Sequence, residues 1–359
     1  MARRQTLLFD SSKDEEGVVA VIEFLTAFTL FLMILTVFMS LVQLELGSND
    51  PLTDRIDKAA VEGLERLTNN EGWFVPYVDG NRDVVNSTSQ WYDIGATALG
   101  QGSLQPGIVS DHILDEKRVD ALKNVSLDNM VSGLGLSKSM QLRLVIKVES
   151  SNDESRVGLI LFDGGADRNT ASISSVASRT FTSNGEVTSV SLEVHNGGRP
   201  PPVLRISEMS ARPANNGPEW IEVVNLNGFA LSLDGWSLER DGGNGQTTHL
   251  FREGVVPGQG LVLFSGDPSS QIIGNATEVF DLGSNGFLGY GSLEGLDNNQ
   301  GRLRLLFAQV HESSGSQICR IDWTPVSGMT LNSTIVWNGG SPSQASSWNV
   351  SNSPTPGQF

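Results

Sequence analysis

The stretch that decides the organisation of this chain is residues 18–41, VVAVIEFLTAFTLFLMILTVFMSL. Glu23 is the only ionisable residue within it. As an α-helix rising about 1.5 Å per residue, the stretch spans ~36 Å, enough to cross a hydrocarbon core about 30 Å thick. The sequence therefore predicts one transmembrane helix, which extends from residue 18 to residue 44.

Basic residues precede this run, and no small-residue cleavage site follows it before Gln43. Arg3, Arg4 and Lys13 lie ahead of the helix, and cationic residues beside a transmembrane helix favour the cytoplasmic side. We expect residues 1–17 to form a cytoplasmic leader and the domains after the helix to be extracellular. This orientation predicts a single-pass protein of the cell membrane, whose first partner is the lipid bilayer.

Residues 17–24, GVVAVIEF, place a glycine, a short apolar stretch and a glutamate at the start of the apolar helix. This arrangement resembles the N-terminus of type IV pilins and archaeal pilin-like proteins. The resemblance implies that prepilin peptidase cleaves after Gly17, that Glu23 neutralises the amino terminus of a neighbouring subunit, and that like subunits form a filament. Cleavage after Val18 would give Glu23 the family's usual spacing, and acidic residues 14–16 stand where the family carries positive charge. A simple signal anchor is the alternative.

The charge of the chain argues against a nucleic-acid partner, and its cysteine content argues against a disulfide or a cysteine zinc site. The 359 residues include 24 Lys and Arg against 41 Asp and Glu, a formal net charge of -17. Binding to nucleic-acid phosphates requires clustered cations, so we expect no nucleic-acid partner. Cys319 is the only cysteine, which rules out an intramolecular disulfide and a cysteine zinc site. At roughly 100–200 residues per domain, the length predicts about two folded units.

The first of these units is predicted at residues 48–195, followed by a linker at 196–202, NGGRPPP. The pattern predicts helices over 48–70 and 114–136, and ordered loops with short extended pieces over 71–105. It also predicts an antiparallel meander of strands over 141–149, 157–163, 172–182 and 186–195. The second helix, its Gly-Leu ending and the strand after it resemble the globular heads of archaeal pilin-like proteins. That resemblance implies an α+β head.

The second unit, residues 203–359, is a series of short strands separated by Gly, Asn, Asp and Pro. Strands are predicted over 203–209, 220–226, 231–239, 260–264, 302–310 and 317–323. Short strands with turn signals and no helical pattern favour an all-β sandwich. Alternation in the second strand places Ile221 and Val223 on one face, the expected core side, and Glu222 on the other.

Several motifs in this unit occur in the order found in the lamin tail domain, which they resemble. They are LRISEM at 204–209, PEWIEVVN at 218–225, LSLDGWSL at 231–238, VPGQGLVLF at 256–264, LRLL at 303–306, CRIDW at 319–323 and SPTPG at 353–357. The resemblance implies an immunoglobulin-like β-sandwich that acts as a structural or interaction module without catalytic residues. The family usually continues to an Asn after its Pro-Gly, whereas this chain stops at Phe359.

Large apolar residues of these motifs are the predicted sandwich core: Trp220, Ile221, Val223, Leu233, Trp236, Leu238 and Trp323. The alternative for the three tryptophans is that they stack on a ligand such as a sugar. Cys319 alternates with charged residues in a predicted strand, which favours a buried small hydrophobe over a nucleophile.

The sequence contains no catalytic motif, and its four histidines lie in separate segments. We therefore expect no enzyme and no cofactor. Asp163, Asp167 and Asn169 supply oxygen atoms in a glycine-rich turn, as calcium loops do, but without the EF-hand spacing. Formation of the turn by Asp and Asn is a sufficient explanation for them.

Five N-x-S/T sequons follow the predicted membrane helix, at Asn86, Asn124, Asn275, Asn332 and Asn349. All lie on the predicted extracellular side, which fits a glycosylated surface protein.

Together these features predict a membrane-anchored, pilin-like archaeal cell-surface protein with a structural or adhesive function, displaying a lamin-tail sandwich outside the cell. Its expected partners are like subunits, other surface proteins or glycans. The alternatives are a minor pseudopilin-like component of a secretion or assembly system, and a membrane-tethered hydrolase whose site would lie within 71–200.

Overall fold

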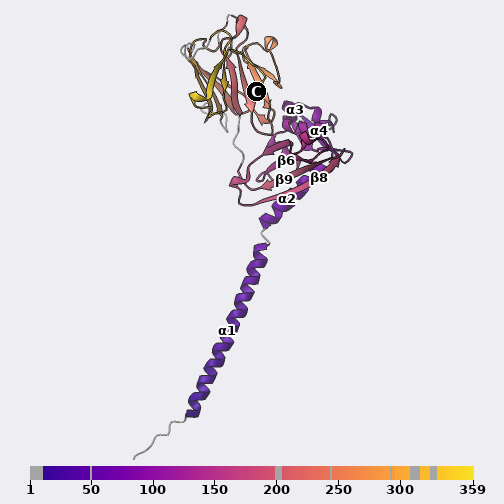
Figure 1. Cartoon of the computed structure of the whole chain (residues 1–359), viewed down its shortest axis with the longest axis vertical. Helices are drawn as coiled ribbons and strands as arrows, with labels where there is room; N and C mark the ends of the chain where they lie inside the picture. The colour runs from indigo at the N-terminus through magenta and orange to yellow at the C-terminus, as the bar shows by residue number, and fades with distance from the viewer. Residues whose placement is uncertain are drawn as a thin grey trace, which may run out of the picture. The chain divides into compact units, whose positions relative to one another are not determined.

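The structure is a computed structural model that describes residues 11–48, 51–198, 204–242, 245–291, 293, 295–307, 316–323 and 330–359. Within these residues the chain is α+β, with an apolar N-terminal helix and a mostly β C-terminal region (Figure 1). This confirms the predicted fold class at that level. The chain divides into two compact units, 1–55 and 56–359, and the second contains two hydrophobic cores.

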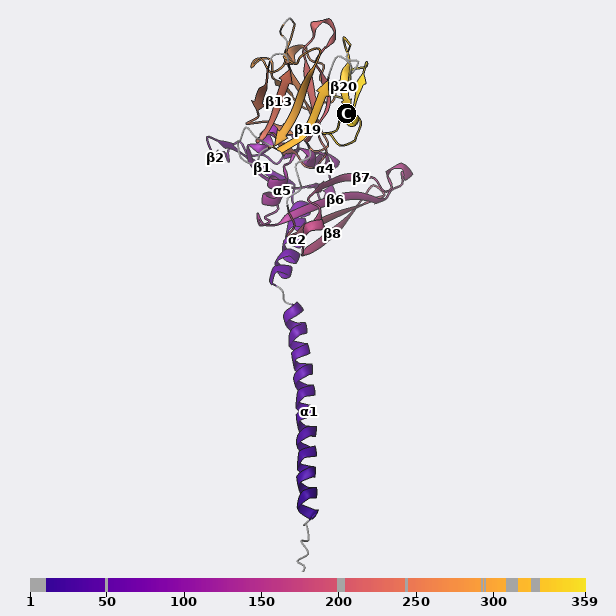
Figure 2. The ribbon, with the colours of Figure 1, turned by 90° about the vertical axis from the view of Figure 1, so that its left-hand side faces the viewer.

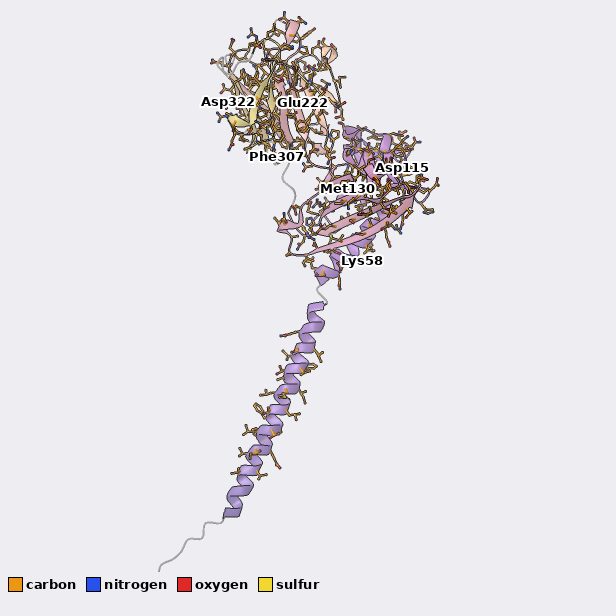
Figure 3. The ribbon with its side chains drawn as sticks, in the orientation of Figure 1. Lys58, Asp115, Met130, Glu222, Phe307 and Asp322 are labelled. Atoms are coloured by element: carbon orange, nitrogen blue, oxygen red, sulfur yellow. The ribbon has the colours of Figure 1, made fainter. Side chains whose placement is uncertain are left out.

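Helix α1 spans Ser11–Ser48 and therefore extends beyond the predicted segment 18–44 at both ends. Every side chain from Val18 to Leu41 is exposed, so apolar groups cover all faces of the helix (Figure 3). The threonine hydroxyls within it each donate a 2.7 Å hydrogen bond to the carbonyl four residues earlier, at Thr26, Thr29 and Thr36. Each hydroxyl therefore has its hydrogen-bond acceptor within the helix, which allows the threonines to lie in a lipid environment that offers no acceptor.

Helix α2, Pro51–Asn69, is the amphipathic helix that the sequence predicts. Ile56, Ala60, Leu64 and Leu67 are buried in the core of residues 56–198, a part that we call the head. Their spacing of three and four residues brings them onto one face of the helix. Leu52, at the start of the predicted stripe, is 40% exposed.

In the region 71–105, predicted as loops with short extended pieces, the extended pieces pair into a three-stranded sheet. Its strands occur in the order β2-β1-β3, and the elements here are β1 (Gly72–Val78), β2 (Asn81–Arg82), η1 (Trp91–Asp93), α3 (Ala96–Gly100) and β3 (Gly102–Pro106). A Cβ at Gly102 would lie 2.4 Å from the Phe74 ring. The glycine allows β1 and β3 to approach, although it interrupts the alternation that marks a strand in sequence.

The helix predicted over 114–136 is two short helices, α4 (Glu116–Ala121) and α5 (Leu127–Gly133), joined by η2 (Leu122–Asn124). Each helix begins at its own cap, because Asp115 accepts a hydrogen bond from Lys117 N and Ser126 accepts one from Asn129 N. Val125 between them is extended. Its carbonyl accepts a 3.0 Å hydrogen bond from Ala230 N, a contact distant in sequence that a continuous helix could not make.

The remaining head strands are β4 (Val109–Ser110), β5 (Ile113–Leu114), β6 (Gln141–Ser150), β7 (Ile160–Gly165), β8 (Ser174–Ser183) and β9 (Glu186–His195), with turns η3 (Glu154–Arg156) and η4 (Arg168–Thr170). The four predicted strands are present and antiparallel, but their order is β7-β6-β9-β8 rather than a meander. Strands β6, β7 and β8 are labelled in Figure 2. The central strands β6 and β9, labelled in Figure 1, supply core residues. A meander cannot place these two most apolar strands next to each other.

The C-terminal β region, residues 204–359, contains two main sheets. The six-stranded sheet has the order β17-β16-β11-β10-β20-β21 and the four-stranded sheet β14-β13-β18-β19. Their strands are β10 (Leu204–Ser210), β11 (Trp220–Asn225), β16 (Leu261–Ser265), β17 (Val279–Asp281), β20 (Thr334–Trp337), β21 (Trp348–Ser351), β13 (Trp236–Gly242), β14 (Thr247–Leu250), β18 (Gly301–Phe307) and β19 (Ser316–Trp323). A small pair, β12 (Leu231–Ser232) and β15 (Val255–Val256), and turns η5 (Ala214–Asn216), η6 (Pro268–Ser270) and η8 (Ala345–Ser347) complete the region.

One hydrophobic cluster draws residues from both main sheets, among them Ile206, Ile221 and Val262 from one and Leu305 and Ile321 from the other. The predicted strand 231–239 is divided, because Gly235 in its middle has a φ of +85° and makes a turn between β12 and β13. Of the predicted linker, residues 199–202 lie outside the described residues.

The loop before β12 joins the C-terminal β region to the head. Phe229 is 2% exposed and belongs to the head core, with its ring centroid 5.0 Å from that of Phe162. Ala230 forms a parallel bridge with Ser126, and Gly258 N donates to the carbonyl of Lys123 at 2.6 Å. These contacts make the two cores adjoining parts of one compact unit.

Candidate functional site

Helix α1 carries the residues predicted for processing and assembly. Val18–Gln43 is the one span in the described part of the chain that is long and apolar enough to cross a membrane. Gly17 lies within α1, and the Glu23 side chain is exposed. Among the described residues no ion pair involves the Glu23 carboxylate.

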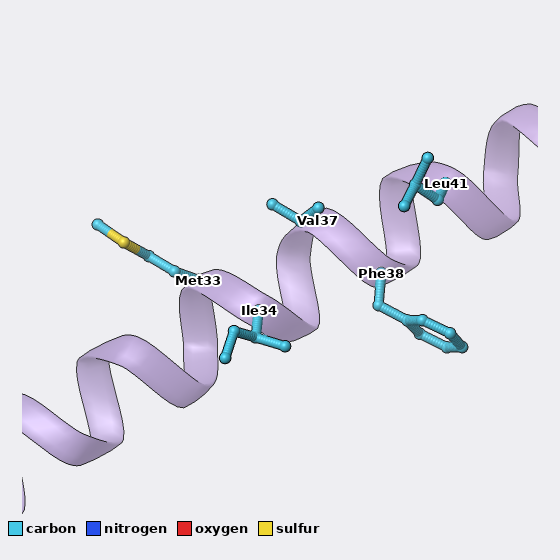
Figure 4. Close-up of a pocket in the computed structure, with 5 residues that line it drawn as sticks. All are labelled: Met33, Ile34, Val37, Phe38 and Leu41. Atoms are coloured by element: carbon cyan, nitrogen blue, oxygen red, sulfur yellow. The ribbon is translucent and has the colours of Figure 1, made fainter.

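A shallow apolar hollow runs along α1, lined by Met33, Ile34, Val37, Phe38 and Leu41 (Figure 4). These side chains are 60–66% exposed. All come from a single helix, so the hollow is a space between neighbouring side chains and has no opposing wall. Its chemistry suits contact with hydrocarbon chains and offers nothing with which to orient a polar ligand.

The calcium candidates do not form a ligand set. Asp163 pairs with Arg143, whose Nη2 lies 2.9 Å from Oδ2 and whose Nε lies 3.1 Å from Oδ1. Asp167 accepts hydrogen bonds from the backbone and side-chain nitrogens of Asn169, at 3.0 and 2.7 Å. The described residues contain no group of three acidic, histidine or cysteine side chains that could hold a metal. The side chains instead stabilise a sheet and a turn.

The sequon asparagines differ in exposure. Four are exposed and one is half-buried; the exposed ones are Asn86, Asn275, Asn332 and Asn349, and the half-buried one is Asn124. The third residues of two sequons have structural roles: Thr334 is buried and donates to Glu208 at 2.6 Å, and Ser126 caps α5. Among the exposed asparagines, Asn86 already donates from its side-chain nitrogen to Asp83 Oδ2 at 2.6 Å.

The predicted core residues of the C-terminal β region are all buried. Ile221, Val223, Leu233, Trp236, Leu238 and Trp323 belong to the cluster between the sheets. Trp220 is 4% exposed but lies outside that cluster, because it faces away from its neighbour Ile221. None of the three tryptophans presents a face on which a sugar could stack. Cys319 is fully buried there too, and burial raises the pKa of its thiol to about 11.

Two buried glutamates lie on the opposite face of the six-stranded sheet, and the sequence analysis assigned them no role. Glu208 and Glu222 are 2% and 1% exposed and stand opposite each other on β10 and β11 (Glu222 is labelled in Figure 3). Burial, with a smaller contribution from the charge of Glu208, raises the pKa of Glu222. Backbone and hydroxyl groups satisfy both carboxylates.

These donors come largely from the C-terminal segment. Thr355 donates from Oγ1 to Glu208 Oε2 at 2.7 Å, and Gly357 N donates to Glu222 Oε2 at 2.7 Å. Gly357 has a φ of +76°, and a Cβ there would lie 2.1 Å from the Ile273 carbonyl oxygen. The two glutamates thus hold the SPTPG segment against the sheet. Glu222 could have been recognised in the sequence as a carboxylate between two apolar residues of a strand, whereas Glu208 is preceded by Ser207.

Glu219 holds a second segment. It is 4% exposed and accepts hydrogen bonds from the backbone nitrogens of Gly289, Gly295 and Leu296 at 2.8, 3.2 and 2.7 Å. Burial raises the pKa of Glu219 to about 7 against the opposing effect of these donors and of Arg240. The carboxylate thereby holds the backbone of the loop between β17 and β18 at three of its nitrogens.

A scan against protein-family models finds no match, and a search of curated proteins finds none either. Among solved structures, the chain is similar to a DUF4876 family protein from Bacteroides thetaiotaomicron, with 12% identity and a TM-score of 0.24, over 50% of this chain and 66% of that one. At that TM-score the likeness carries no argument about fold or function.

Proposed function

We propose that this protein is a single-pass, membrane-anchored cell-surface protein with a structural or adhesive function. Its N-terminal helix and head would be pilin-like, and its C-terminal β region would be a lamin-tail, immunoglobulin-like sandwich displayed outside the cell. The observation that carries the proposal is α1, whose side chains from Val18 to Leu41 are apolar on every face and exposed. Such a surface is stable only against lipid or against other apolar helices.

The lamin-tail assignment is supported by the positions of its motifs. The motifs at 204–209, 218–225 and 303–306 fall on strands β10, β11 and β18 of two sheets around one core. The closing SPTPG segment is held by the glutamates of the first two motifs. Residues that resemble one family in sequence are thus in contact in the fold.

The test is membrane fractionation of the native cells, followed by protease treatment of intact cells and N-terminal sequencing of the recovered protein. We expect the protein in the membrane fraction and resistant to carbonate extraction. Its head and C-terminal β region should be digested from outside. A mature N-terminus after Gly17 or Val18 would support the pilin-like assignment, and one at Met1 would support a simple signal anchor. Recovery in the soluble cytoplasmic fraction would overturn the proposal.

A further inference from the structure

Two exposed aromatic residues of the head, Trp73 and Tyr77, lie on one face of the three-stranded sheet β2-β1-β3. Trp73 is the most exposed of the seven tryptophans, at 48%, and Tyr77 on the same strand is 44% exposed. Residues an even number of positions apart on a strand face the same side, so both rings project from one face. Trp73 and Tyr77 are four residues apart, which separates their backbone positions by ~13 Å. Figure 2 shows that the β1–β2 hairpin reaches out from the rest of the head.

The neighbours on this face are polar and carry no negative charge. Gln105 lies directly opposite Trp73, Ser103 opposite Val75, and Arg82 opposite Tyr77. The strand positions of this face hold no carboxylate, although the chain has a net charge of -17. Within the described residues, neither the Trp73 indole nitrogen nor the Tyr77 hydroxyl has a hydrogen-bond partner. Trp91 and Trp323, by contrast, donate to backbone carbonyls at 3.0 and 2.8 Å.

We infer that this face binds an uncharged, extended glycan. The two rings would stack on the apolar faces of separate sugar units, while the amide of Gln105 and the hydroxyl of Ser103 bind sugar hydroxyls between them. Aromatic side chains suit this task, because each combines a large apolar face with a polar tip. Two rings on backbone positions ~13 Å apart suit an oligosaccharide rather than a single sugar.

Other occupants fit this face less well. A stable protein partner usually buries about 800 Å² on each side, whereas the apolar part of this face consists of Trp73, Val75 and Tyr77. Single-stranded nucleic acid also stacks on aromatic rings, but it requires a cationic groove, and Arg82 is the one cation on the strand positions of this face. A glycan needs neither a large apolar area nor positive charge.

The inference deepens the proposed function, since it names the class of partner that a surface protein would hold. The binding test does not depend on whether the protein is displayed at the cell surface. Purified full-length protein in lipid nanodiscs is titrated with cellohexaose, chitohexaose and mannohexaose, and tryptophan fluorescence and calorimetry are recorded. We expect at least one of these to bind. Trp73→Ala and Tyr77→Ala should each weaken it roughly tenfold or more.

Tyr290→Ala is the matched control, because Tyr290 is 43% exposed and lies in the C-terminal β region. It should leave binding unchanged, and unaltered circular dichroism would show that each variant folds. The inference is overturned if none of the three hexasaccharides binds, if Trp73→Ala binds as well as the parent, or if an oligo-dT probe binds more tightly than the sugars. Any of these outcomes leaves the fractionation result, and so the proposed location, unaffected.

Discussion

At the scale of single residues, three buried glutamates are the notable charged groups of the C-terminal β region. Glu208, Glu219 and Glu222 are at most 4% exposed, and their charge is opposed mainly by backbone and hydroxyl donors. The Lys58–Glu62 pair on α2 is different, with side chains 74% and 52% exposed. Exposed pairs of that kind contribute about 0–1 kcal/mol, so pH effects on stability should trace to the buried groups.

Glu219 predicts a stability that increases on mild acidification. Its folded pKa is raised from 4.5 to about 7, so the folded state favours the protonated form. The stabilisation is present in full below pH ~4.5 and is lost as the pH rises through ~7. Between pH 8 and pH 5 this residue should add up to about 3 kcal/mol to the free energy of unfolding. Thermal unfolding across that range measures the effect.

The variant Glu219→Gln should remove this part of the pH dependence and lower stability at every pH, because one amide oxygen replaces two acceptors for three donors. Glu253→Gln is the control, since Glu253 is exposed. If the stability of Glu219→Gln changes with pH as that of the parent does, Glu219 is not the group that titrates between pH 5 and pH 8.

At the scale of elements, prediction from sequence succeeded where burial follows a regular period. The stripe of α2 and the four long head strands are examples, because one face of each meets a core. It did not predict that the extended pieces of 71–105 pair into a sheet, because Gly72 and Gly102 interrupt the alternation. It also failed at 114–136, where Val125 leaves the helix to bond with Ala230. Those elements depend on partners distant in sequence, which no local pattern contains.

The closing segment 353–357 is an element without secondary structure that is nevertheless held in place. Thr355→Val removes the hydroxyl that donates to Glu208 and leaves a buried carboxylate short of a donor. We expect a loss of about 1–2 kcal/mol in the free energy of unfolding and faster hydrogen exchange at the amides of Gly357 and Asn275. Exchange at the Asn275 amide measures release of the segment, because this amide donates to the Gly357 carbonyl at 2.7 Å.

Ser353→Ala is the control for that variant, because Ser353 is exposed and takes part through its backbone alone. Equal exchange rates in Thr355→Val and the parent would mean that the two glutamates do not hold the segment.

At the scale of the molecule, Phe229 connects the head to the C-terminal β region. Phe229→Ala should open a cavity in the head core and cost roughly 3–5 kcal/mol. Because Phe229 is the residue of the C-terminal β region that belongs to the head core, we also expect unfolding to change from one cooperative transition to two. Calorimetry and tryptophan fluorescence during urea unfolding would show the separation.

Leu226→Ala is the matched change, since Leu226 lies in the same loop and is 41% exposed. It should leave a single transition at nearly the parent's stability. If Phe229→Ala still unfolds in one step, the backbone contacts at Ala230 and Gly258 would be sufficient to couple the two parts.

The sequence by itself determined two kinds of element: a helix surrounded by apolar groups on every side, and strands or helices that bury one regular face. These are the apolar helix, whose length and composition match a bilayer, and the strands that alternate between core and water. Only the tertiary structure decided which polar residues are buried and which aromatics are not. Glu208, Glu219 and Glu222 are stable inside because donors from distant loops reach them, and Trp73 and Tyr77 stay outside because their strand has one covered face. Burial is a property of contacts between distant segments, and a pattern along the chain records only the near ones.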